Sequence, residues 1–253
     1  MNAPDLPLVA AAQTVVVRGD IAANVARHVM LAAIAARHGA RMIVFPELSL
    51  TGYEPGLVAE LALRADDARL APLRDAACCE GIVIVAGAPL ANSGGLPLIA
   101  VLTFQPDGVT HVYTKQHLHD GEAAAFAPGQ GGAALMVDGA RMALAVCAEI
   151  THASHAAAAA AAGAQLYAAS VLVSENGYAA DAALLQGYAA THALPVLMAN
   201  HGGPTGGWHS AGRSAVWDEA GALVGAAPGG GECLLLAQRT GGTWNARVID
   251  TAG

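Results

Sequence analysis

The chain contains 253 residues, of which 55% are hydrophobic and 13% charged, and its formal net charge is −8. That length suits one large α/β domain, so we expect residues 1–253 to form a single domain. The negative charge and the lack of a lysine and arginine cluster argue against a nucleic-acid ligand, because phosphate backbones are bound through clustered positive charge.

The first half of the chain alternates predicted strands and helices. Residues 8–17 are rich in β-branched side chains, which favours a strand. Residues 21–38 place apolar side chains at helical spacing and stop at Gly39, which predicts a helix with a glycine just past its end. Three further elements are predicted in this half: a buried strand at 42–45, a helix at 71–80 and a strand at 82–86.

From residue 98 onwards the pattern indicates antiparallel pairing. Residues 98–104 and 109–115 are predicted to form a hairpin that turns at the Gln-Pro-Asp-Gly sequence between them. A strand at 141–147 then leads into the alanine tract 156–162, which predicts a helix. The last predicted elements are a strand at 165–169, a helix at 178–192, a strand at 195–199 and a hairpin that turns at 218–221. Strand-helix-strand units combined with hairpins predict mixed sheets.

Neither a membrane span nor a disulfide framework is predicted. The longest apolar region, residues 142–173, is interrupted by polar side chains, and the N-terminal apolar stretch has no basic residue before Arg18. The four cysteines form no Cys-x-x-Cys pair, so reduced thiols are expected. These features favour a cytoplasmic protein that does not bind membranes.

Three predicted strands end at a reactive side chain. Glu47 follows one strand, Lys115 closes the first hairpin and Cys147 ends the strand at 141–147. Because α/β proteins assemble their sites at strand ends, these side chains are expected to meet. A cysteine attacks as a thiolate, a carboxylate can accept its proton and a lysine can stabilise an oxyanion. Taken singly, each has a simpler interpretation: a helix-start charge, a solvated lysine and a small buried side chain.

The motifs around these residues resemble those of the nitrilase superfamily of carbon-nitrogen hydrolases. The sequence Phe-Pro-Glu-Leu-Ser-Leu-Thr-Gly-Tyr at 45–53 is similar to the family's glutamate motif, and Tyr-Thr-Lys-Gln-His-Leu at 113–118 is similar to its lysine motif. Glu122 matches the family's second glutamate, and Phe-Ala-Pro-Gly at 126–129 matches the sequence that trails it. The similarity covers nearly the whole chain, which favours the catalytic interpretation of all three side chains.

The cysteine motif departs from the usual family pattern. Glu149 stands where an aspartate is common, and residues 150–155 replace the arginine and Phe-Pro-Glu that follow the cysteine in many members. The nucleophile is kept while the loop expected to face the substrate differs. The resemblance therefore carries over the mechanism better than it carries over the substrate.

The resemblance implies a four-layer α-β-β-α sandwich, an α/β fold in which two mixed sheets pack face to face with helices outside. It also implies a homodimer or higher homo-oligomer formed through a helical layer, which suits a chain with so few charged residues. No metal and no organic cofactor is expected.

The resemblance further implies a thiol hydrolase that cleaves carbon-nitrogen bonds other than peptide bonds. Glu47 would take the thiol proton and Cys147 would attack the amide carbon, while Lys115 and the Ala148 backbone N–H hold the oxyanion. Glu122 would orient Lys115 or the substrate. The first expectation is a small carboxamide substrate, converted to a carboxylate and ammonia through a cysteine thioester.

Several alternatives remain open from the sequence. Nitrile hydrolysis, N-carbamoyl hydrolysis and acyl transfer use the same Glu-Lys-Cys set, and the chain leaves little room for the C-terminal extension typical of nitrilases. A non-catalytic binding protein on the same fold is an alternative of another class, and the intact Glu, Lys, Glu and Cys argue against it.

The substrate pocket is predicted from residues that lie beside the motifs or in loops after strands. These residues are Tyr53, Glu149, His152, Asn176, Asn200 and Trp208. Packing in the core or at a dimer interface explains Trp208 equally well, and turn formation explains Asn200 equally well.

Histidine pairs raise a metal-binding interpretation that the sequence does not favour. His117 and His119 lie close together, and His152 and His155 are three residues apart. Neither pair comes with carboxylates or thiolates at ligand spacing. We expect His152 and His155 to shape the substrate entrance instead.

Overall fold

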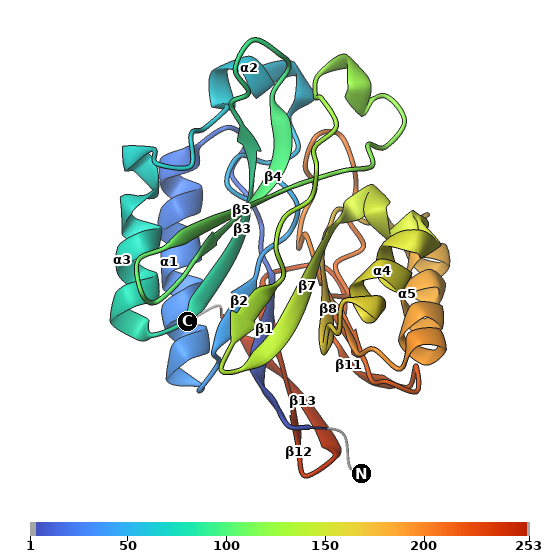
Figure 1. Cartoon of the computed structure of the whole chain (residues 1–253). Coiled ribbons are helices and arrows are strands. Elements are labelled where there is room, and N and C mark those ends of the chain that lie inside the picture. The colour runs from blue at the N-terminus through green and yellow to red at the C-terminus, as the bar shows by residue number, and fades with distance from the viewer. Residues whose placement is uncertain (1–3, 252–253) are drawn as a thin grey trace.

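Two β-sheets pack against each other in the computed structural model, which describes residues 4–251 (Figure 1). The strands of the first sheet, in spatial order, are β13 (Thr243–Asp250), β12 (Cys233–Thr240), β1 (Leu6–Gln13), β2 (Met42–Val44), β3 (Val83–Leu90), β4 (Leu98–Phe104) and β5 (Thr110–Thr114). The strands of the second sheet, in spatial order, are β11 (Leu223–Ala226), β10 (Ala215–Trp217), β9 (Val196–Asn200), β8 (Leu166–Val171), β7 (Ala140–Val146) and β6 (Leu135–Val137).

Each sheet is built around three parallel strands. β1, β2 and β3 pair in parallel, as do β7, β8 and β9, and antiparallel strands complete the edges. Parallel neighbours need a crossover connection, which a helix provides while it covers the outer face of the sheet. The helices are α1 (Ile21–Arg37), α2 (Val58–Leu61), α3 (Ala71–Glu80), α4 (Ala153–Ala161) and α5 (Tyr178–His192).

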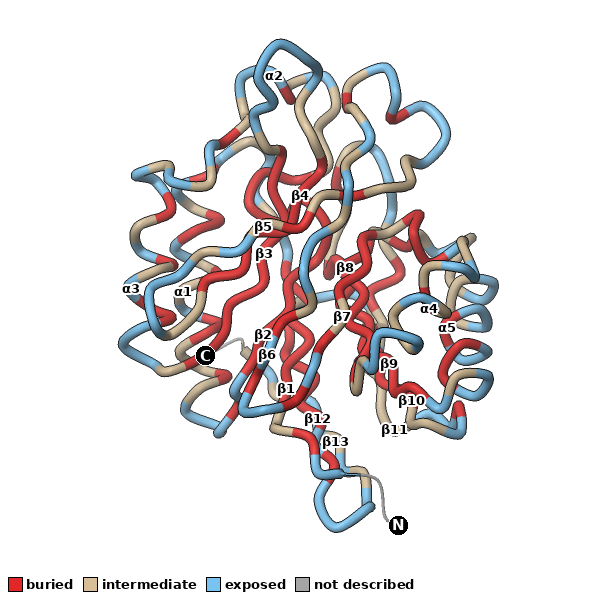
Figure 2. Tube along the Cα trace, viewed as in Figure 1, coloured by how far each residue is buried: buried red, intermediate tan, exposed pale blue. Residues whose placement is uncertain are grey.

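The alternation of side chains along the strands separates the layers. In β2, Met42 and Val44 join the core between the two sheets, whereas Ile43 packs on the side of α1 and α3. A third apolar cluster lies between the second sheet and the helices α4 and α5. Figure 2 shows that burial follows the strands while the outer sides of these helices are exposed. The layers therefore run α-β-β-α, which confirms the predicted sandwich of two mixed sheets.

Several elements differ from the sequence-based prediction: α2 and β6 were not predicted, and β3 extends to Leu90. β1 ends at Gln13 rather than at residue 17, because the Gln13 side chain donates to the carbonyls of Gly229 and Gly231 and the chain then leaves the sheet. The β12–β13 hairpin completes the first sheet without having been predicted as a hairpin. β13 alternates exposed and half-buried residues, so no run of buried apolar side chains marks it.

The helical layers contain no element suited to a lipid bilayer. Within residues 4–251, no helix is both long and apolar enough to cross a membrane.

Candidate active site

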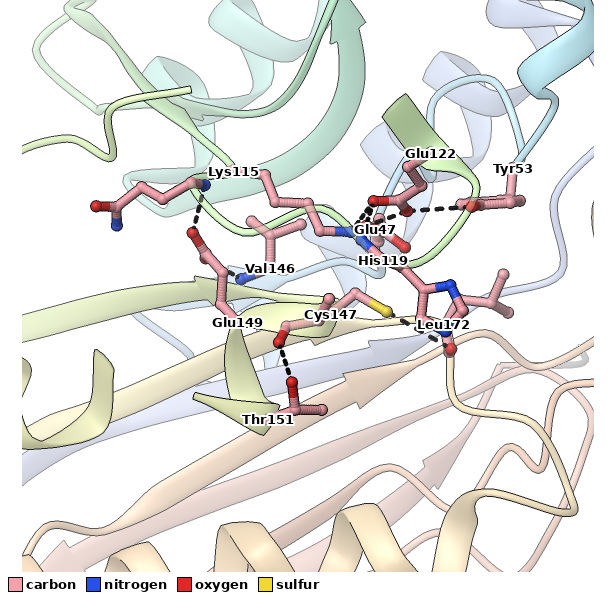
Figure 3. A network of polar contacts seen from close by, with 12 residues as sticks. Glu47, Tyr53, Lys115, His119, Glu122, Val146, Cys147, Glu149, Thr151 and Leu172 are labelled. Carbon is pink, nitrogen blue, oxygen red and sulfur yellow. Dashed lines mark hydrogen bonds and ion pairs between the residues drawn. The ribbon is translucent and has the colours of Figure 1, made fainter. Parts of the chain in front are cut away.

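A buried lysine lies between two carboxylates at one end of the sheets. Lys115 follows β5, and its Nζ donates to Glu47 Oε1 at 2.7 Å and to both carboxylate oxygens of Glu122 at 2.9 and 2.8 Å (Figure 3). Burial lowers the pKa of Lys115, but the neighbouring carboxylates of Glu47 and Glu122 outweigh it and hold the pKa above its ordinary value. The ammonium form is therefore secured by its surroundings.

Glu122 is held in turn by two neighbours. Its Oε2 accepts from the His119 backbone N–H at 2.7 Å, and its Oε1 accepts from the Tyr53 hydroxyl at 3.1 Å. With the two bonds from Lys115, the carboxylate has no freedom to turn toward another partner. Glu122 thus fixes the position of the Lys115 ammonium rather than facing a substrate alone.

Glu47 keeps one oxygen unused. Its backbone carbonyl accepts from His201 Nε2 at 2.7 Å, and its Oε1 is bound to Lys115. Its Oε2 is buried and has no hydrogen-bond partner among the described residues. Burial raises the pKa of Glu47, and the charge of Lys115 opposes this rise. An unused buried carboxylate oxygen is an available proton acceptor.

Close packing holds the turn that carries Glu47. Gly87 of β3 lies against this turn, and a Cβ atom at Gly87 would lie 2.3 Å from the Leu48 backbone nitrogen. Only glycine leaves room for that approach. Leu48 itself has a φ of 51°, so the turn combines a tight fit with a left-handed residue.

Cys147 stands at a sharp bend between β7 and the short 3₁₀ helix Cys147–Thr151. Its φ is 43°, a left-handed conformation that costs a residue with a side chain about 1 to 3 kcal/mol. Its Sγ donates to the Leu172 carbonyl at 3.7 Å. Burial raises the pKa of the thiol, the charge of Glu47 adds to the rise, and Lys115 opposes it. Ala148 is the second residue of the 3₁₀ helix, where the backbone N–H has no partner within the helix.

The Glu149 side chain connects the bend at Cys147 to the segment that follows Lys115. Its Oε2 accepts from the Val146 backbone N–H at 2.7 Å, and its Oε1 accepts from the Gln116 backbone N–H at 2.7 Å. The Tyr113 hydroxyl donates to Oε2 at 2.9 Å. Glu149 is fully buried and does not line the cavity, which corrects its expected role as a pocket residue. The bend at Cys147 directs the Glu149 side chain toward backbone N–H groups in the interior instead of toward the cavity.

A cavity of about 200 Å³ opens above the thiol. Among the described residues, those that line it are Glu47, Tyr53, His119, Glu122, Cys147, Ala148, Ile150, Thr151, Leu172, Val173, Ser174, Gly177, Asp181 and Trp208. Tyr53 and Trp208 were expected there from the sequence. His119, Thr151 and Asp181 were not expected there, and no sequence motif marks Asp181, which lies in the first turn of α5, as a cavity residue.

Three other expected pocket residues lie away from the cavity. The His152 ring stacks on His117 with 3.9 Å between ring centroids. Asn176 is exposed in the loop before α5. Asn200 is buried, where its side chain accepts from the backbone N–H groups of Val173 and His201 and donates to the carbonyls of Val173 and Gly212. Because every polar atom of Asn200 is used, this residue fixes loops and cannot reach a ligand.

The second histidine of the pair after the nucleophile also departs from its expected place. His155 lies between the hydroxyls of Tyr113 and Tyr167, each 2.8 Å from a ring nitrogen, and so belongs to the network behind Glu149 and not to the cavity entrance. In residues 4–251, no group of three or more histidine, cysteine, aspartate or glutamate side chains is arranged to hold a metal ion.

Comparison with known proteins gives a family and a set of structural neighbours. The family model for "Carbon-nitrogen hydrolase" matches residues 8–246. A solved mutant of an amidase from Nesterenkonia sp. AN1, described as from the nitrilase superfamily, is 29% identical, with 92% of this chain and 91% of that chain covered and a TM-score of 0.84. No curated protein sequence gives a significant match.

Two further structures of the same amidase contain bound compounds. In one, the acetamide moiety of fluoroacetamide is covalently added at the active-site cysteine; it is 28% identical, with 94% of this chain and 92% of that chain covered and a TM-score of 0.85. The other is a complex with butyramide, with 28% identity, the same coverages of 94% and 92%, and a TM-score of 0.85.

Proposed function

The chain belongs to the carbon-nitrogen hydrolase family, and from this we propose that it hydrolyses a small carboxamide to a carboxylate and ammonia through a thioester on Cys147. The family and its amidase neighbours make it an enzyme for carbon-nitrogen bonds other than peptide bonds. The related amidase binds butyramide, and its cysteine takes up an acetamide moiety. A cavity of about 200 Å³ suits substrates of that size, because drug-sized ligands occupy roughly 300 to 1,000 Å³.

The observation that carries the proposal is the free oxygen of Glu47. A buried acceptor without a partner costs free energy and so calls for a functional explanation, and Glu47 lines the same cavity as Cys147. Burial raises the pKa of the Cys147 thiol, so attack at neutral pH calls for a base beside the sulfur. Glu47 then acts as a general base rather than as a neighbour of a preformed thiolate.

The first half-reaction forms the thioester. As the Cys147 sulfur bonds to the amide carbon, Glu47 takes the thiol proton and the carbonyl electrons move onto oxygen. The Lys115 ammonium and the Ala148 N–H stabilise this oxyanion. When the intermediate collapses, the carbon-nitrogen bond breaks, and the leaving nitrogen takes the proton from Glu47 and departs as ammonia.

The second half-reaction releases the acid. Water attacks the thioester while Glu47 accepts its proton, and the carbon-sulfur bond then breaks. The sulfur recovers the proton from Glu47, and the carboxylic acid leaves. Glu122 contributes by holding Lys115 through charge-assisted hydrogen bonds of 2.8 and 2.9 Å in both steps.

An ammonia-release assay tests the proposed substrate class. We expect release from short carboxamides, with weaker or no release from nitriles and N-carbamoyl compounds. Cys147→Ala should abolish turnover and leave the fold intact, because the change removes one sulfur atom and no large core side chain. Ammonia release at the wild-type rate by this variant would show that cysteine is not the nucleophile. A hydroxylamine trap reports acyl transfer separately.

Labelling distinguishes an enzyme from a non-catalytic binding protein. Cys233 supplies an internal control, since it is buried and burial raises its pKa to about 11. With an adjacent base, Cys147 should react with a small electrophile at neutral pH far faster than Cys233 does. Equal labelling of the two cysteines, read by peptide mass spectrometry, would favour the binding protein.

We further propose that the chain acts as one domain in a cytoplasmic homodimer. The four cysteines are all free, as suits a reducing compartment. Helix α4 leaves most of its alanines partly or fully exposed and so offers a smooth face for a second subunit. Sedimentation at several concentrations tests the dimer, and a monomer at micromolar concentration would contradict it.

A further inference from the structure

The cavity above Cys147 runs from a buried floor to an open mouth. Glu47, which lines the cavity, is fully buried, and so is the Lys115 side chain to which it is hydrogen-bonded. At the other end His119 is exposed and Trp208 is 45% exposed, and their rings meet edge to face with 6.3 Å between centroids. Because the reacting carbon of an amide must reach Cys147, the remainder of the substrate extends toward this mouth.

An unpaired carboxylate lines the same cavity. Asp181 in the first turn of α5 is half-buried, and among the described residues its side chain makes no hydrogen bond or ion pair. A Cβ atom at Gly177 would lie 3.4 Å from Asp181 Oδ2, so the glycine leaves this oxygen uncovered. Burial raises the pKa of Asp181 and His119 opposes the rise, while partial exposure to water keeps the charge stabilised.

The charges around the cavity do not balance. Among the described residues that line the cavity, Glu47, Glu122 and Asp181 supply three carboxylates and there is no lysine or arginine; the Lys115 ammonium lies behind the lining and directs its donors at Glu47 and Glu122. A substrate carboxylate would therefore meet net repulsion from these three carboxylates. A cationic group would meet Asp181, and the Trp208 ring at the mouth would add cation–π attraction.

We propose that Asp181 selects amides that carry an ammonium group at the end remote from the carboxamide. The inference rests on the proposed amidase function and names its substrate class: short amino-amides are preferred over neutral amides of equal length, and amides with a terminal carboxylate are rejected. Asp181 acts by charge, since it is a half-buried carboxylate in the cavity lining, whereas Glu47 is fully buried.

Three amides of matched length test this selection: 4-aminobutanamide, neutral pentanamide and anionic succinamate. Wild-type kcat/KM should fall in that order. Asp181→Asn should lower kcat/KM for the amino-amide by about tenfold, as expected for loss of a half-exposed charge pair, and leave pentanamide within about twofold. Asp181→Lys should reverse the order of the charged substrates. Asp120→Asn is the matched control, because it removes an exposed carboxylate near His119 that does not line the cavity.

The outcomes separate this inference from the proposed function. Absence of hydrolysis of all three amides would overturn the amidase proposal itself. Hydrolysis of pentanamide with no preference for the amino-amide, or a preference that survives in folded Asp181→Asn, would overturn the role of Asp181 alone. A lowered melting temperature without altered selectivity would mean that Asp181 only stabilises the start of α5.

Discussion

Glu149→Gln is predicted to slow catalysis from a position outside the cavity. The carboxylate accepts three hydrogen bonds, from the backbone N–H groups of Val146 and Gln116 and from the Tyr113 hydroxyl. Val146 precedes Cys147, and Gln116 follows Lys115. Glutamine offers one acceptor oxygen in place of two, so its NH₂ group must face one of the two backbone N–H groups.

The size of the effect follows from that conflict. One buried N–H without an acceptor costs about 1 to 3 kcal/mol, and loss of charge-assisted bonding brings the total to roughly 2 to 5 kcal/mol. This is a large share of a typical folding stability of about 5 to 15 kcal/mol, yet less than the whole. Without these hydrogen bonds, the backbone at Cys147 can relax from its φ of 43°. A displacement of about 1 Å at a reacting group can reduce the rate about 100-fold.

Steady-state kinetics and urea unfolding together test this role. We expect kcat to fall about 10- to 100-fold with KM little changed, because Glu149 does not line the cavity. Glu149→Asp should recover part of the rate, since it keeps two charged acceptor oxygens. Glu80→Gln, at an exposed position, is the control and should behave as wild type. If Glu149→Gln lost stability as calculated while kcat stayed at the wild-type value, the hydrogen bonds of Glu149 would stabilise the fold without positioning Cys147 or Lys115.

Three further predictions concern the residues around the thiol. With a reactive amide, mass spectrometry should trap an acyl adduct on Cys147 more readily in Glu122→Gln than in Glu47→Gln, because only Glu47 is the proton acceptor; equal trapping would contradict these roles. Gly87→Ala should yield little folded protein on purification, since its Cβ would collide with backbone 2.3 Å away; a normal melting temperature would contradict this. Burial lowers the pKa of His201 to about 4, against 6.5 in the unfolded chain, so acid protonates the unfolded state first. The free energy of unfolding should therefore fall by about 3 kcal/mol as the pH drops from 6.5 to 4. In urea titrations at pH 7 and 4.5, His201→Gln should show a smaller fall in the free energy of unfolding than the wild type.

Local sequence patterns predicted the elements that bury one face and expose the other. Helix α3 occupies the predicted range 71–80, because Leu73, Ala76 and Ala77 form a buried stripe and Gly81 ends the helix at a φ of 62°. The β12–β13 hairpin escaped prediction because β13 is an edge strand with a partly exposed alternating pattern. Such a strand is held mainly by backbone pairing with β12, which leaves little trace in the side chains.

Two acidic residues show why a site is harder to predict than a fold. Glu149 lies two residues after the nucleophile and was expected in the pocket, whereas Asp181 lies 34 positions from Cys147 and was not. Sequence position locates a strand end, but the direction of a side chain depends on backbone dihedrals. The left-handed bend at Cys147 and the 3₁₀ turn after it send Glu149 inward, where backbone N–H groups bind it. The crossover through α5 instead places Asp181 in the lining of the cavity that Cys147 also lines. Asp181, which is remote from Cys147 in sequence, is therefore the acid that a substrate can contact, whereas the neighbouring Glu149 binds the backbone on either side of the site.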